Sequence, residues 1–179
     1  MNPPKSNEHN AYFQRYIDLC EDAELYDQYD KNTNNLVSFL ESLPIEKHQF
    51  AYAEEKWTIL QLFRHIIDCE RVFGYRALVA ARGDSTILPS FDENNYADAV
   101  AEETTSMVNM LKEFTLLRQS NRVLFENMSE VQSCFTANVN GEPLSARAIA
   151  FILIGHINHH LNVMQERYSK CRKIKLNAN

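Results

Sequence analysis

The last third of the chain contains histidines at a spacing that suits a metal ion. His156 and His160 lie four residues apart in an otherwise largely apolar segment, from Ile152 to Leu161. Residues four apart lie on one face of an α-helix about 6 Å from each other, so both imidazoles can reach one ion. An unpaired buried polar ring is destabilising, whereas metal coordination satisfies it. The pattern predicts a divalent metal site in a helical core.

A third imidazole, that of His65, lies on the apolar stripe of a helix expected over 58–83. With His156 and His160 it would form a three-histidine set with open coordination positions, which is typical of a catalytic metal site. His159 could replace His160 as a ligand or lie on the helix flank, and we prefer His160. The alternative interpretation of all these residues is a set of structural histidines satisfied within the core.

Further side chains near His65 have two interpretations each. Cys69 follows one turn later on the same face, where it could be a soft ligand or a nucleophile, and we interpret it as apolar filler. Asp68 and Glu70 could support the metal ligands or form ion pairs with arginines, and no catalytic role is assigned to them. The arginines considered as their partners are Arg71, Arg76 and Arg118.

Four long helices are needed to position these residues. Apolar side chains recur at close to 3.6-residue spacing over four segments. These segments are 23–43, 58–83, 100–128 and 145–168. Thr58 and Gln61 form a predicted capping box, Pro44 ends the first helix, and Ser145 is a candidate cap for the last. Such helices can bury their stripes only against one another, which predicts an all-α four-helix bundle.

The segments between the helices are less regular. Residues 11–20 are expected to form a short amphipathic helix that packs on the bundle as a flap. The composition of 83–97 favours a loop, and 133–143 is interpreted as two short extended pieces around an Asn-Gly turn. Trp57 and Tyr96 could close a pocket mouth, but we interpret them as packing residues.

Length and charge limit the class of protein. The chain has 179 residues and a formal net charge of −6, which argues against a nucleic-acid partner. It lacks an apolar run long enough for a signal peptide or a membrane helix, and its four cysteines are scattered, so a cytoplasmic protein with reduced thiols is expected. We expect one domain over 1–179, with an N-terminal flap or short helix at 1–22 and a flexible tail at 170–179.

The chain resembles the DinB-like (DinB/YfiT) superfamily of metal-dependent enzymes over most of its length. The similar segments are Tyr52-Ala53 to Trp57-Thr58, His65 to Asp68, Glu70-Arg71, Tyr75 to Ala77, Ala81 to Glu93, Gly155-His156, His159-His160 and Glu166 to Tyr168. Carried over residue by residue, the metal triad of that family falls on His65, His156 and His160. The resemblance also implies a bundle in up-down-down-up order and a homodimer.

The resemblance further implies an activity. Characterised relatives include transferases that join a small thiol to an electrophile, so the leading expectation is a thiol S-transferase acting on those two small molecules. Three neutral imidazoles leave the charge of a divalent ion, Zn or Ni by expectation, uncompensated, and either a thiol or a water could become the nucleophile. A metal-dependent hydrolase is therefore the chemical alternative, and a non-catalytic metal-binding stress-response protein is the third.

Overall fold

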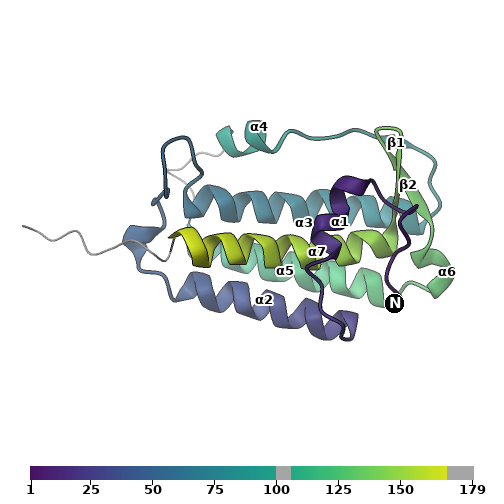
Figure 1. The fold of residues 1–179 in the computed structure, drawn as a ribbon, viewed down its shortest axis with the longest axis horizontal. Helices are drawn as coiled ribbons and strands as arrows, with labels where there is room; N and C mark the ends of the chain where they lie inside the picture. Colours follow the sequence, from purple (N-terminus) through teal and green to yellow (C-terminus); the bar gives the residue numbers. More distant parts are fainter. Residues whose placement is uncertain (100–105, 169–179) are drawn as a thin grey trace, which may run out of the picture.

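Four long helices form the body of the protein in the computed structural model, which describes residues 1–99 and 106–168 (Figure 1). Their bounds are Leu25–Glu41 for α2, Ile59–Ala81 for α3, Met107–Glu126 for α5 and Ala146–Val163 for α7. A π-helical turn over Met164–Tyr168 follows α7. The predicted tail at 170–179, and residues 100–105 of the predicted third helix, lie outside the described residues.

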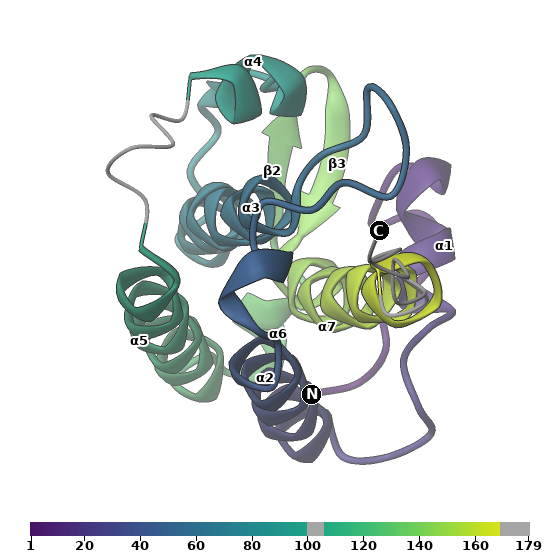
Figure 2. The ribbon, with the colours of Figure 1, turned by 90° about the vertical axis from the view of Figure 1, so that its left-hand side faces the viewer.

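The order of the helices is up-down-down-up, as predicted. α2 and α3 run in opposite directions, whereas α3 and α5 run in the same direction because the chain returns along the bundle before α5 begins (Figure 1). α7 then runs opposite to both. Viewed along the bundle, the four helices surround a common interior (Figure 2). Within the described ranges, no helix combines the length and the apolar character needed to span a membrane.

Local sequence signals account for the helix ends. At the start of α3 the Gln61 backbone N–H donates to the Thr58 hydroxyl at 3.2 Å, and the Gln61 side chain accepts from the Thr58 backbone N–H at 2.9 Å. This is the predicted capping box. Ser145 caps α7 by accepting a hydrogen bond from the Ala148 backbone N–H at 3.0 Å. The apolar stripe of α3 is buried mainly against α5 and α7.

Short elements close one end and one side of the bundle. α6 (Glu130–Ser133) follows α5 and leads into β2 (Thr136–Val139) and β3 (Glu142–Ser145), which form an antiparallel hairpin. The turn at Asn140 and Gly141 has positive φ at both residues, 51° and 90°, so the predicted Asn-Gly hairpin is confirmed. β3 leads directly into α7, so the position of the hairpin determines where α7 begins.

The prediction of a loop over 83–97 was wrong in part. Residues Ile87–Leu88 form β1, which pairs in parallel with β2, and Glu93–Asp98 form the short helix α4 beside α3. The Asp92 side chain accepts hydrogen bonds from the backbone N–H groups of Asn94 and Asn95, at 2.9 and 3.1 Å. This N-cap offsets the low helix propensity of the asparagines.

The N-terminal residues pack across α7. Instead of one amphipathic helix, residues 11–20 contain a 3₁₀ turn, η1 (Ala11–Phe13), followed by α1 (Gln14–Ile17). A separate 3₁₀ turn, η2 (Ile45–Lys47), follows α2. Tyr16 is buried, whereas Tyr12 of the predicted apolar side is 53% exposed, because the turn is too short to bury both rings. A Cβ at Gly155 would overlap the Tyr16 carbonyl, so glycine permits this close approach.

Candidate metal centre

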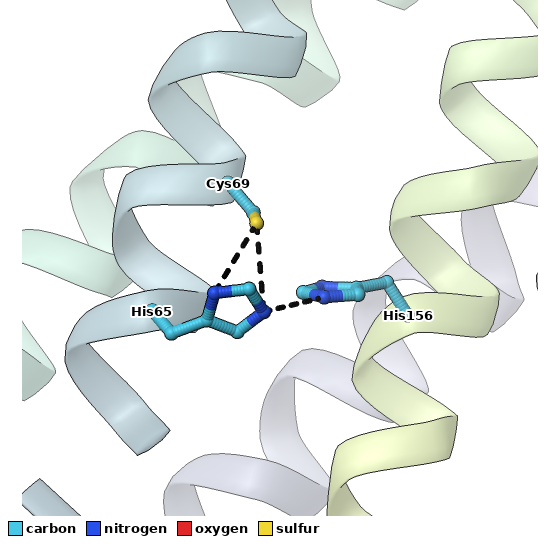
Figure 3. Close-up of side chains that lie close together, drawn as sticks. All are labelled: His65, Cys69 and His156. Carbon is cyan, nitrogen blue, oxygen red and sulfur yellow. Dashed lines mark hydrogen bonds between the residues drawn. The ribbon is translucent and has the colours of Figure 1, made fainter. Parts of the chain in front are cut away.

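Two facing helices bring the predicted histidines together. His65 projects from the N-terminal half of α3 toward α7, and Cys69 follows it one turn later on the same side (Figure 3). His156 and His160 project from α7, one turn apart. The three imidazole rings are neighbours, with centroid separations of 5.1 Å for His65 and His156, 5.1 Å for His65 and His160, and 4.4 Å for His156 and His160.

The nitrogen atoms of these rings approach in a way that hydrogen bonding alone cannot satisfy. Nε2 of His156 lies 3.1 Å from Nε2 of His65 and 3.0 Å from Nε2 of His160. A ring nitrogen carries either one N–H or one in-plane lone pair, so it can form a strong hydrogen bond with only one of these neighbours. Nδ1 of His160 is also buried without a partner among the described residues.

A divalent ion fits this arrangement. Two imidazole nitrogens bound to one tetrahedral ion at 2.0–2.1 Å are about 3.3 Å apart, close to both observed separations. An ion would therefore remove the unfavourable approach of nitrogen lone pairs. The sequence predicts that His65, His156 and His160 hold it, and this assignment stays a prediction. The group whose donor atoms all lie within 4.8 Å of one another is His65, Cys69 and His156, so Cys69 is also a candidate ligand.

Burial keeps the imidazoles in the protonation state that a ligand requires. The low polarity around His65 lowers its pKa to about 4, and the negative charge of Glu93 opposes this effect only in part. Burial also lowers the pKa of His156 and of His160 well below the usual value, and the neighbouring histidines lower both further. Neutral rings present lone pairs to a cation at neutral pH.

The two adjacent histidines of α7 lie in different surroundings. The His160 ring is buried beside His156, whereas His159 is exposed and its ring packs edge-on against Tyr16 at a centroid distance of 5.7 Å. The observed placement therefore favours His160 over His159 as the neighbour of His156.

Cys69 lies closer to the imidazoles than a side chain that only packs in the core needs to be. Its Sγ lies 3.7 Å from Nε2 and 3.9 Å from Nδ1 of His65, and it forms with His65 and His156 a group whose potential ligand atoms all lie within 4.8 Å of one another. Burial raises the pKa of the Cys69 thiol well above its usual range. Without an ion the thiol is therefore protonated, and a nearby cation would favour its thiolate form.

A cavity of about 470 Å³ opens over the imidazoles. Aromatic side chains from several elements contribute to its walls, and they are Tyr12, Phe13, Tyr16, Trp57, Phe73 and Phe91. Trp57, interpreted above as a packing residue, lies against His65 with a ring centroid separation of 5.0 Å. Tyr96 does not line the cavity and packs against Phe91.

Comparison with known proteins assigns the chain to a family. The family model of the DinB superfamily matches residues 28–164, a range that contains all three imidazoles and most of the bundle. The chain belongs to the DinB superfamily. A protein of Oceanobacillus iheyensis, named as a candidate metal-dependent hydrolase, is 28% identical over 139 residues, which are 75% of this chain and 78% of the relative.

A solved structure has the same fold as this DinB-superfamily protein. YfiT from Bacillus subtilis, described as a probable metal-dependent hydrolase with an unusual four-helix bundle topology, matches with a TM-score of 0.72 at 14% identity. The match covers 94% of this chain and 93% of YfiT. At that identity the likeness shows the bundle and its topology.

Three charged residues that line the cavity were not assigned to the site from the sequence. They are Arg76 of α3, Glu93 of α4 and Glu142 of β3. Arg76 was considered only as a partner of Asp68 or Glu70, but Glu70 pairs with Arg118 at 2.9 Å. A sequence signal existed for Arg76, which lies eleven residues after His65 on the same helical stripe. Glu93 lies in the segment interpreted as a loop, and no periodic pattern relates it to the histidines.

Proposed function

We propose that the protein is a metal-dependent hydrolase of small molecules, with a divalent ion held by His65, His156 and His160. The observation that supports this most strongly is the position of His156 Nε2, at 3.0–3.1 Å from two other imidazole nitrogens at the edge of a cavity. When bound there, such an ion would polarise the scissile group and make a water molecule nucleophilic near neutral pH.

The residues of the chain have separate roles in this proposal. The imidazoles present neutral nitrogens in a fixed arrangement because α3 and α7 pack directly against each other. The aromatic walls limit the access of bulk water and bind the apolar part of a substrate. Glu93, whose charge acts on His65, accepts the proton released by the attacking water.

Tyr16 is assigned a hydrogen-bonding role. Its hydroxyl accepts a hydrogen bond from Arg15 Nη2 at 3.0 Å, and its ring lies edge-on to His156 at a centroid distance of 5.4 Å. Burial raises the Tyr16 pKa to about 12, so the hydroxyl stays protonated at neutral pH. A protonated hydroxyl at the cavity wall can donate a hydrogen bond to a substrate oxygen.

Zinc or nickel is proposed as the ion, because both bind imidazole well and either would accept an additional sulfur donor from Cys69. The two relatives named above are both called metal-dependent hydrolases, which supports hydrolysis. The expected thiol S-transferase activity, with its thiol and electrophile partners, and the expected homodimer stay predictions.

The test begins with the metal content of untagged protein, measured by elemental mass spectrometry. We expect about one transition-metal ion per chain. The variant His160→Ala should lose stoichiometric metal, whereas the matched neighbour variant His159→Ala should keep it. Retention of metal by His160→Ala together with its loss from His159→Ala would reverse the choice of ligand.

Activity is then measured with 4-nitrophenyl esters and anilides, with and without a chelator. Hydrolysis that the chelator abolishes and added metal restores supports the proposal. A parallel assay with a thiol and 1-chloro-2,4-dinitrobenzene follows loss of the thiol. Metal-dependent thiol consumption without hydrolysis would contradict the hydrolase proposal and support a thiol S-transferase. One bound metal with neither activity would indicate a non-catalytic metal-binding protein.

A further inference from the structure

The cavity wall includes a buried arginine that has few hydrogen-bond partners among the described residues. The Arg76 side chain is 5% exposed, and its Nη2 donates a hydrogen bond to the Pro89 carbonyl at 2.8 Å. None of the ion pairs formed within residues 1–99 and 106–168 includes Arg76. A guanidinium has five N–H donors, so most of its hydrogen-bonding capacity is available to a ligand.

The other buried arginines show what is missing at Arg76. Arg118, 1% exposed, donates to the Glu70 carboxylate at 2.9 Å and to three further oxygen acceptors on α2. Arg147, 6% exposed, donates through Nε to the Glu8 carboxylate at 2.6 Å. A buried charge without a counterion is unfavourable, and burial lowers the pKa of Arg76. Within residues 1–99 and 106–168, Arg76 therefore lacks the carboxylate partner that Arg118 and Arg147 have.

The surroundings of Arg76 are aromatic. Its Cζ lies 5.2 Å from the ring centroid of Phe73 and 5.7 Å from that of Phe91, and both rings line the cavity. Arg76 follows His65 by eleven residues on α3, which corresponds to a rise of about 16 Å. Helical side chains lean toward the N-terminus, which for Arg76 is the direction of His65, and Arg76 and the imidazoles line the same cavity. An elongated molecule could contact both groups.

We propose that Arg76 binds a carboxylate at one end of the substrate, whose apolar or aromatic body lies between Phe73 and Phe91 and whose reacting group lies at the imidazoles. This inference rests on the proposed function and names its substrate class. Among the described residues, the other charged side chains that line the cavity are the exposed carboxylates Glu93 and Glu142. They would repel a second negative charge, so a monocarboxylate fits better than a phosphate dianion.

The test compares two ligands of nearly the same size and shape, 3-phenylpropionate and 3-phenylpropionamide, of which only the first is charged. Their binding to the full-length protein, as purified with its metal, is measured by isothermal titration calorimetry. We expect the acid to bind about tenfold more tightly than the amide, because it forms charge-assisted hydrogen bonds with a guanidinium. Arg76→Gln should abolish this preference, and Arg76→Met should do the same if the glutamine variant does not fold.

The matched control is Arg71→Gln, on the same helix but half exposed and paired with Glu113, which should keep the tenfold preference. A preference that persists in Arg76→Gln would place the carboxylate elsewhere, for example on the ion, and would overturn the inference. Equal affinity for the two ligands, or no saturable binding of the acid, in the natural protein would also overturn it.

Metal content and melting temperature distinguish ligand binding by Arg76 from a structural role. Metal content is determined on the same samples. The binding comparison does not require turnover, so the hydrolase proposal can fail in the activity assay while the binding result still tests the role of Arg76. A purely structural role for Arg76, holding Pro89 in place, predicts a lowered melting temperature in Arg76→Met with the acid preference intact. The ligand-binding role predicts an unchanged or raised melting temperature with the preference lost.

Discussion

Consecutive residues of α3 belong to two polar regions with opposite properties. Glu70 faces α5, where Arg118 and Asn121 donate hydrogen bonds to both of its carboxylate oxygens at 2.9 Å. Cys69 faces the cavity, where the imidazoles and Arg76 have few or unsuitable partners. Polar groups satisfied within the protein stabilise the fold, whereas those left without partners are available to bind something else. One helix therefore supports both stability and the candidate site.

The strongest test of this comparison is the removal of Arg118. Arg118→Met leaves the Glu70 carboxylate buried without its counterion, and should lower the free energy of unfolding by about 3–5 kcal/mol. Urea denaturation measures the change. Arg71→Met, at a half-exposed position, should change the stability by about 1 kcal/mol or less. Equal losses in the two variants would mean that the Glu70 region is no more important for the fold than the surface.

Glu8 and Arg147 form a second buried ion pair, and its contribution to stability depends on pH. The hydrogen bond from Arg147 is the main factor that lowers the pKa of Glu8, from 4.5 to about 2. A carboxyl whose pKa is lower in the folded state stabilises the protein above pH 4.5, and this contribution is lost as the pH falls toward 2. Glu8→Gln should therefore flatten the fall in stability between pH 5 and 2, measured by urea denaturation at each pH.

In the cavity, the expected effect is on activity instead of stability. Glu93→Gln removes the proposed proton acceptor and should lower the rate of ester hydrolysis about a hundredfold, within the usual range for general base catalysis. The unfolding midpoint should change little because Glu93 is exposed. Glu142→Gln, at another exposed carboxylate of the same cavity, should keep most of the rate. A similar loss in both variants would point to a general charge effect.

The smallest expected effect concerns the contact that holds α1 over the cavity. In Gly155→Ala the new methyl group must displace the Tyr16 carbonyl, at a cost of about 1–3 kcal/mol. Because Tyr16 lines the cavity, the rate of ester hydrolysis should fall as well. Asn162→Ala, at an exposed position of α7, is the control and should leave both unchanged. An unaffected activity in Gly155→Ala would show that α1 is not needed for the site.

The bundle and part of the site could be predicted because both depend on local periodicity. The spacing of His156 and His160 places them on one face of α7 whatever the rest of the chain does, and Thr58 with Gln61 determines the start of α3. The hairpin was predictable for the same reason, since the Asn140-Gly141 turn is encoded in two residues.

The remaining features depend on which helix faces meet. Glu70 had three arginines available to it by sequence, and only the packing of α3 on α5 decides that Arg118 is its partner. The cavity, and the position of Glu93 in it, depend on how α4 and the hairpin pack beside α3. These are contacts between distant segments, which periodicity does not specify.

The direct packing of α3 on α7 has a consequence for biogenesis. His65 and His156 are separated by 91 positions, so the imidazole cluster includes residues from both halves of the chain. During synthesis, which adds about 5–20 residues per second, α3 is complete several seconds before α7 has been made. A nascent chain would therefore expose His65 and Cys69 without their partners, and the full donor set would form only when the last helix docks. We expect metal loading to follow translation.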